Sequence, residues 1–161
     1  MLFRSGLTGS ATGAEAVVVE GKNQAAVSDS TLTTGSRRAG IMLYQSMSGD
    51  AADADAAAQA STLTLTGVSL TCTDPVPLLY VTNTTSQATL TDCTLSNSGA
   101  LASADEDRWG TSGSNGGTLA LTLDATTSDG AITAGSTSSI TVTAINGGGA
   151  TGTTSGSVTV S

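Results

Sequence analysis

The sequence predicts an all-β protein whose chain winds as a right-handed parallel β-helix, a single-stranded solenoid of roughly five coils with uncapped ends. Three observations predict it. Aliphatic residues alternate with threonine and serine, a two-block pattern recurs, and polar or glycine-rich corners separate the blocks. The 161 residues include one Trp, one Phe and two Tyr, so the aromatic anchors of a compact core are nearly absent. A thin core of stacked Val, Ile and Leu suits a solenoid, in which each coil contacts only its neighbours.

The first block of the repeat has an apolar residue, a small or apolar residue three positions later, and a leucine two positions after that. Its three copies are Val27/Ser30/Leu32, Leu65/Val68/Leu70 and Leu90/Cys93/Leu95. The copies are 38 and then 25 residues apart. Alternation within the copies predicts that Leu63, Leu65, Val68 and Leu70 face the core. The same alternation predicts that Thr62, Thr64, Thr66 and Ser69 face water.

A second block precedes each copy of the first. It reads AVVVEGKN from Ala16, GIMLYQS from Gly40 and PLLYVTNT from Pro77, with a degraded fourth copy, LASADEDRWG, from Leu101. The tail from Thr118 continues the alternation as TLALTLDATTSDG, SSITVTAINGGG and SGSVTVS. Two short strands per repeat of about 25 residues describe one coil of a parallel β-solenoid.

The whole chain, 1–161, is expected to form a single domain. Residues 1–14 are expected to be an N-terminal coil edge or linker, and 48–61 an inserted surface loop, because AADADAAAQA favours a helix but lacks an apolar stripe. Stacked coils leave unpaired strand edges at both ends unless these are capped. The chain is therefore expected to be a fragment of a longer protein, or to stack end to end with other copies.

An immunoglobulin-like sandwich is the rival all-β fold. It also has short strands at regular intervals, but its core is usually built around a buried aromatic residue. The only tryptophan of this chain lies in a polar run, DRWGTSGSNGG. The solenoid is therefore the preferred fold.

Composition excludes several classes of function. The net charge is −8 with five basic residues, which argues against binding to nucleic acid or to anionic membrane surfaces. The chain has no histidine, which excludes Ser-His and Cys-His nucleophiles and His-ligated zinc. No run of 18 apolar residues is present, so no membrane-spanning helix is expected.

Four phrases carry a resemblance to a known group of proteins. VVVEGKN, GIMLYQSMSGDA, LLYVTNTT and RWGTSGSNGG resemble sequences of bacterial parallel β-helix proteins of the carbohydrate-binding, adhesin-like and pectate-lyase-like kinds. The resemblance covers about Ala16 to Ile145. It implies a bacterial protein that is secreted or attached to the cell surface and binds polysaccharide or a host glycan, often with bound calcium. The high alanine content and the single lysine depart from the group's pattern.

Acidic residues gather in two places and are candidate calcium ligands. Asp50, Asp53 and Asp55 lie in the expected insertion, and Asp105, Glu106 and Asp107 follow the fourth copy of the second block. Calcium takes six to eight oxygen ligands from carboxylates and carbonyls on flexible loops. The spacing matches neither the EF-hand nor the glycine-rich nonapeptide repeat. A solvated acidic corner that keeps the protein soluble is the alternative.

Aromatic residues are the candidate carbohydrate-binding residues. Tyr44 and Tyr80 occupy similar places in successive copies, so they are expected to form an exposed row against which sugar rings stack. Trp109 lies in a Gly/Ser loop, and Asn83 and Arg108 complete the candidate set. The alternative is that each ring covers a coil edge with its polar group hydrogen-bonded, and that Trp109 packs under its loop.

Catalysis is not expected. A glycosidase needs two carboxyl groups at a fixed separation, and a pectate lyase needs calcium and a positioned basic residue. The carboxylates show no convergence, and the candidate bases Lys22, Arg37, Arg38 and Arg108 lie on expected corners or loops. A polysaccharide lyase remains the least favoured of three functions, after a glycan-binding surface protein and a self-assembling structural protein.

Two further features complete the predictions. The repeat alignment matches Cys93 with Val68 and Cys72 with Asn97, an offset that separates the two cysteines by more than the ~7 Å that a disulfide spans. Two buried free thiols are therefore expected. The threonine ladders raise an ice-binding solenoid, which is disfavoured because the copies differ in length and the threonine positions drift.

Overall fold

The protein is described by a computed structural model that covers residues 2–45, 60–106 and 115–161. Within these ranges the regular elements are all β-strands, and every paired strand is parallel to its neighbours. The strands form three large sheets and one small one. The all-β prediction is confirmed, and parallel stacked sheets are compatible with a β-helix.

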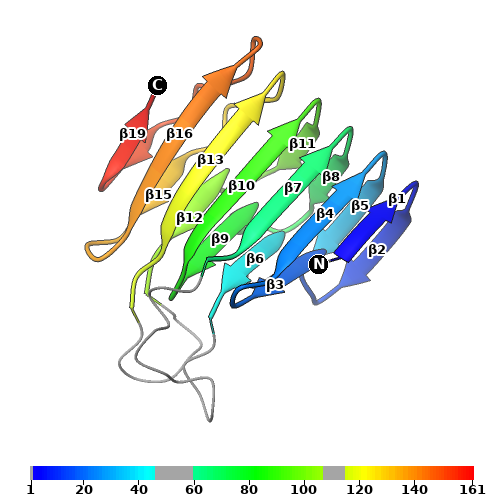
Figure 1. Ribbon diagram of the computed structural model, residues 1–161, viewed down its shortest axis with the longest axis horizontal. Helices are drawn as coiled ribbons and strands as arrows, with labels where there is room; N and C mark the ends of the chain where they lie inside the picture. Colours follow the sequence, from blue (N-terminus) through cyan, green and yellow to red (C-terminus); the bar gives the residue numbers. More distant parts are fainter. Residues whose placement is uncertain (1, 46–59, 107–114) are drawn as a thin grey trace.

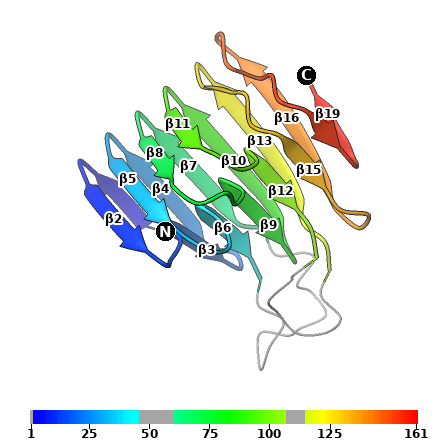
Figure 2. The same cartoon turned by 180° about the vertical axis from the view of Figure 1, so that it is seen from behind.

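Sheet A forms the longest side of the molecule (Figure 1). In sheet order its strands are β1 (Leu2–Ser5), β4 (Gln24–Ser28), β7 (Thr62–Thr66), β10 (Thr85–Thr91), β13 (Thr118–Asp124), β16 (Ser139–Ile145) and β19 (Val158–Val160). Sheet B contains β2 (Thr8–Thr12), β5 (Thr31–Gly35), β8 (Ser69–Cys72) and β11 (Thr94–Asn97), which lie side by side when the molecule is seen from behind (Figure 2).

Two further sheets complete the architecture. Sheet C contains β3 (Val17–Glu20), β6 (Ile41–Tyr44), β9 (Leu79–Thr82), β12 (Ala102–Ala104), β15 (Ile132–Ala134) and β18 (Thr154–Ser155). Sheet D contains β14 (Thr127–Ser128) and β17 (Gly149–Ala150). The chain therefore passes from sheet A to sheet B or D, then to sheet C, and returns to sheet A. Each such passage is called a turn below.

The register of the sheets agrees with the predicted repeat. Leu65 pairs with Val27 on one side and Leu90 on the other, and Leu70 pairs with Leu32 and Leu95. The second block aligns in the same way, because Ile41 pairs with both Val17 and Leu79. The first block of the repeat thus forms strands of sheets A and B, and the second block forms strands of sheet C.

One core runs through the stack. It is built from inward-facing aliphatic residues of all three large sheets, from Val19 to Val142. Leu63, Leu65, Val68 and Leu70 are all at most 1% exposed, as predicted. Their outward neighbours Thr62, Thr64, Thr66 and Ser69 are half-buried or exposed, also as predicted. Burial of each such side chain contributes about 1.5–3 kcal/mol to stability. These contributions hold successive turns together.

The middle strands of sheet C, β6, β9 and β12, are buried on both faces, a feature that alternation in the sequence does not predict. Met42 and Tyr80 alternate with core residues and so point away from the main core, yet they are 4% and 1% exposed. They pair in register and form a second cluster with Ala39, against which Tyr44 packs. Strands buried on both faces carry continuous apolar runs instead of an alternating pattern, which explains the sequences IMLY and LLYV.

The corner between sheet A and the next strand begins with a residue of positive φ in each turn. The residues in this column are Gly6, Asp29, Gly67, Asp92, Ala125 and Asn146, with φ between 47° and 66°. Backbone N–H groups continue the parallel ladder through this corner, for example from Asp29 to Thr66 and from Gly67 to Thr91. Glycine, asparagine and aspartate tolerate this conformation, whereas alanine is strained in it by about 1–2 kcal/mol.

Replacing Ala125 with glycine is therefore expected to raise the free energy of unfolding by about 0.5–1 kcal/mol. Asparagine at this position is expected to act in the same direction. The matched control is Ala120→Gly, at an exposed position of β13, which is expected to lower stability by about 0.5–1 kcal/mol. Urea unfolding followed by circular dichroism measures both effects. Equal destabilisation by the two glycines would contradict the strain at Ala125.

Candidate functional site

The predicted row of exposed tyrosines is corrected by the structure. Tyr80 is 1% exposed, and its hydroxyl donates a hydrogen bond to the backbone oxygen of Glu106 at 2.9 Å. Tyr44 is half-buried against the same cluster and pairs in register with Thr82 instead of Tyr80. The alternative interpretation, a ring that covers a coil edge with its hydroxyl bonded, is therefore confirmed for Tyr80.

Asn83 is likewise an interior residue and not a surface ligand. It is 0% exposed, and its φ of 55° places it at the corner between β9 and β10. Its side-chain oxygen and nitrogen, and the Thr82 hydroxyl, have no hydrogen-bond partner among the residues that the structure describes. Its short, polar side chain suits the left-handed backbone of the corner, which is a structural reason for asparagine there. The other two candidates, Arg108 and Trp109, lie outside the described residues.

Most of the candidate calcium ligands also lie outside the described ranges. This applies to Asp50, Asp53 and Asp55 of the expected insertion, and to Asp107. Asp105 is half-buried, and its carboxylate accepts a hydrogen bond from the Glu106 backbone nitrogen at 2.9 Å. Over residues 2–45, 60–106 and 115–161, no three His, Cys, Asp or Glu side chains are grouped closely enough to hold a metal ion.

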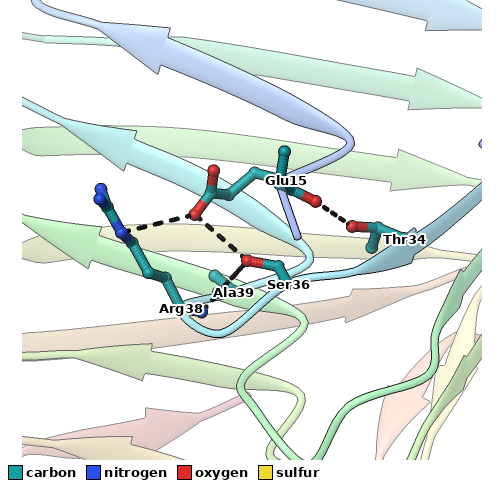
Figure 3. Close-up of polar contacts among 6 residues, drawn as sticks. Glu15, Thr34, Ser36, Arg38 and Ala39 are labelled. Carbon is teal, nitrogen blue, oxygen red and sulfur yellow. Dashed lines mark hydrogen bonds and ion pairs between the residues drawn. The ribbon is translucent and has the colours of Figure 1, made fainter. Parts of the chain in front are cut away.

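The candidate base Arg38 belongs to a corner network between sheets B and C (Figure 3). Its Nε lies 4.0 Å from Oε1 of Glu15, which also accepts a hydrogen bond from the Ser36 hydroxyl at 3.2 Å. The same Ser36 oxygen accepts hydrogen bonds from the backbone nitrogens of Arg38 and Ala39. Ser36 is 1% exposed, so these bonds fix the corner. Arg38 therefore makes a structural contact with the Glu15 carboxylate.

The two cysteines are free and buried, as predicted. Burial raises the pKa of both thiols, so the neutral form is favoured. The Cys93 thiol donates a weak hydrogen bond to the Thr91 oxygen at 3.3 Å. Ser30 and Thr126, at the same corner in other turns, bond in the same way to the residue two positions earlier. Cys93 therefore serves as a donor at the corner as well as a small apolar side chain.

Sheet A presents an outward surface of uncharged polar side chains. Thr64, Thr89, Thr122 and Thr143 occupy one register column, so the expected drift of the threonines is wrong for this column. In the neighbouring column, Gln87 and Ala120 separate the threonines. From β4 to β16, Asp124 is the only charged residue in the strands of this sheet. Hydroxyls also occupy three successive strands in two other columns, Ser28/Thr66/Thr91 and Thr85/Thr118/Ser139.

A polar groove lies where sheet B ends and sheet D begins. We call it the ledge groove. Its lining residues are Leu95, Ser96, Asn97, Thr127, Ser128, Asp129 and Thr151, and its volume is about 410 Å³. Sequence reasoning missed this feature because it depends on how two successive turns differ in width. The sequence indicates the narrower turns only through the shorter interval between matched residues, which is 21 residues from Leu121 to Val142 and 25 from Leu63 to Ala88.

Comparison of the chain with protein-family models, with curated proteins and with solved structures found no match. The similarity to bacterial β-helix proteins therefore stays a prediction from the quoted phrases. In the part of the chain that the structure describes, no helix is long and apolar enough to span a membrane.

Proposed function

We propose that the chain is a right-handed parallel β-helix of six turns followed by β19, and that it is a non-catalytic bacterial surface protein that binds polysaccharide. In this proposal the protein is secreted or attached to the cell surface and resembles an adhesin. The proposed six turns compare with roughly five coils expected from the repeats, and the sixth turn contains the two-residue strands β17 and β18.

The observation that carries the proposal is the outer surface of sheets A and B. The strands of sheet B contain no charged residue, and those of sheet A from β4 to β16 contain one, although the chain has a net charge of −8. Outward hydroxyls of threonine and serine are both donors and acceptors, as are the hydroxyls of sugars. A long, uncharged surface of this kind is suited to an extended polysaccharide.

Retention on immobilised polysaccharides tests this function. The folded chain is expected to be retained on at least one of a panel of neutral and acidic polysaccharides, with and without calcium. The chain unfolded in urea and diluted onto the same matrices serves as the control, because binding that depends on the sheet surfaces requires the fold. Failure of the folded chain to bind any matrix, in either buffer, would contradict the proposal.

Self-assembly from end to end is the second candidate function. β1 and β19 are the outer strands of sheet A, and each has one strand neighbour within residues 2–45, 60–106 and 115–161. Unpaired backbone groups on an outer strand can pair with another copy. Light scattering and electron microscopy separate this function from the first, because self-assembly produces fibres whose length grows with protein concentration.

A further inference from the structure

The ledge groove is built by a change in the width of the turns. β11 has four residues and is the last strand of sheet B, whereas β14 has two and pairs only with β17. Counting from Asp92 and Ala125, which occupy the same corner in the two turns, Ser96 and Asn97 extend past the end of β14. The later turn bends inward at this point.

Gly130 makes this inward bend possible. A Cβ atom on Gly130 would lie 2.7 Å from the backbone nitrogen of Leu101, so any larger residue would push the two turns apart. The edge of β11 therefore faces the narrower turn across an open space instead of a paired strand. The groove follows from the arrangement of the described strands.

The groups that line the groove are held in place by their own hydrogen bonds. The Asn97 amide donates to the backbone oxygens of Gly99 and Ala100 at 2.8 and 2.9 Å, which leaves its carbonyl oxygen as an acceptor. The Ser128 hydroxyl accepts a hydrogen bond from the Gly130 backbone nitrogen at 3.2 Å and keeps its proton to donate. Ordered side chains lose less entropy when a ligand binds.

We propose that the ledge groove binds a neutral saccharide. This inference rests on the proposed function and assigns it a site. The volume of about 410 Å³ falls within the range of small-molecule sites. The Asp129 carboxylate, which is exposed, accepts hydrogen bonds from a pair of adjacent sugar hydroxyls. Leu95, which is half-buried, supplies an apolar patch for the C–H groups of the ring.

The charge of the groove selects against acidic sugars. Asp129 is the one charged residue among those that line it, and no lysine or arginine is among them. A uronic acid would bring a second carboxylate beside Asp129 without a cation to offset the repulsion. A neutral hexose or pentose chain meets no such repulsion. The groove is therefore predicted to prefer neutral polysaccharides over pectate, the substrate class that the pectate-lyase-like resemblance implies.

Titration calorimetry with defined oligosaccharides tests the site. Cellohexaose, mannohexaose and xylohexaose are the neutral probes, and hexagalacturonate is the acidic one. Asp129→Asn is expected to weaken binding of the neutral ligand about tenfold or more, because a carboxylate makes stronger hydrogen bonds than an amide. The matched control is Asp29→Asn, which removes the same charge at an exposed corner where φ is 49° and asparagine is well tolerated.

A second variant keeps the test independent of charge. Ser96→Trp places a large ring over the groove from an exposed position of β11, and it is expected to abolish binding while the far-UV spectrum is unchanged. Neutral-ligand binding that survives both Asp129→Asn and Ser96→Trp would overturn the groove as the site, while the proposed function would stand. Preference for hexagalacturonate would overturn the neutral specificity. If the chain is retained on a polysaccharide matrix but binds none of the four oligosaccharides, its binding surface lies outside the ledge groove.

Discussion

Replacing Leu65 with alanine is expected to lower the free energy of unfolding by about 3 kcal/mol, within the range for buried leucines. Leu65 is fully buried, and it lies in register between Val27 and Leu90 at the centre of the stack. The cost has two parts, the lost burial of the side chain and the cavity that the neighbouring turns fail to fill. Both parts are large here because parallel strands on either side fix the backbone.

The matched control is the adjacent outward residue. Thr64→Ala changes the same strand without opening a cavity and is expected to shift stability by less than about 0.5 kcal/mol. Urea unfolding gives the two values, and amide hydrogen exchange locates the effect. Since each turn contacts only its neighbours, exchange is expected to speed up first in β4, β7 and β10. A uniform increase along the whole chain would contradict this nearest-neighbour picture.

Replacing Thr126 with valine is expected to cost about 2 kcal/mol even though the two side chains have nearly the same shape. The Thr126 hydroxyl is fully buried, accepts a hydrogen bond from the Cys93 nitrogen at 3.0 Å, and lies within bonding distance of the Leu90 and Asp124 oxygens. Valine leaves the buried nitrogen of Cys93 without a partner. An unpaired buried donor bears its full desolvation cost.

Serine at position 126 separates the hydroxyl from the methyl group. Thr126→Ser keeps the hydrogen bonds and loses only one methyl group, so it is expected to be less destabilising than Thr126→Val. The comparison is made by thermal and urea unfolding of the two variants in the same buffer. A valine variant as stable as the unmodified chain would show that the hydroxyl contributes nothing at this corner.

The fold was largely predictable because its signals are local and periodic. Alternation in TLTLT and the matched copies around Val27, Leu65 and Leu90 identified which residues face the core and which pair across turns. The buried outer face of sheet C was not predictable in this way. Met42 and Tyr80 lie in continuous apolar runs, in which sequence alternation gives no information about the second face.

The candidate site was less predictable than the fold. Aromatic and acidic residues are the usual contacts for sugars and calcium, and Tyr80 and Asn83 are surface candidates in the sequence. Both are fully or almost fully buried. The ledge groove instead depends on Gly130 and on β14, which is two residues shorter than β11. Such a difference between neighbouring turns becomes visible only when the register of the sheets is known.

The continuous register of sheet A has a consequence for how this chain tolerates change. From Ala25 to Leu63 the chain takes 38 residues to return to the same column, from Leu63 to Ala88 it takes 25, and from Leu121 to Val142 it takes 21. The spacing between strands is nevertheless set by backbone pairing alone. Residues added where the chain leaves sheet C therefore alter neither the register nor the core. That corner is a natural position at which lineages can gain or lose segments, and at which an engineer can graft a foreign peptide.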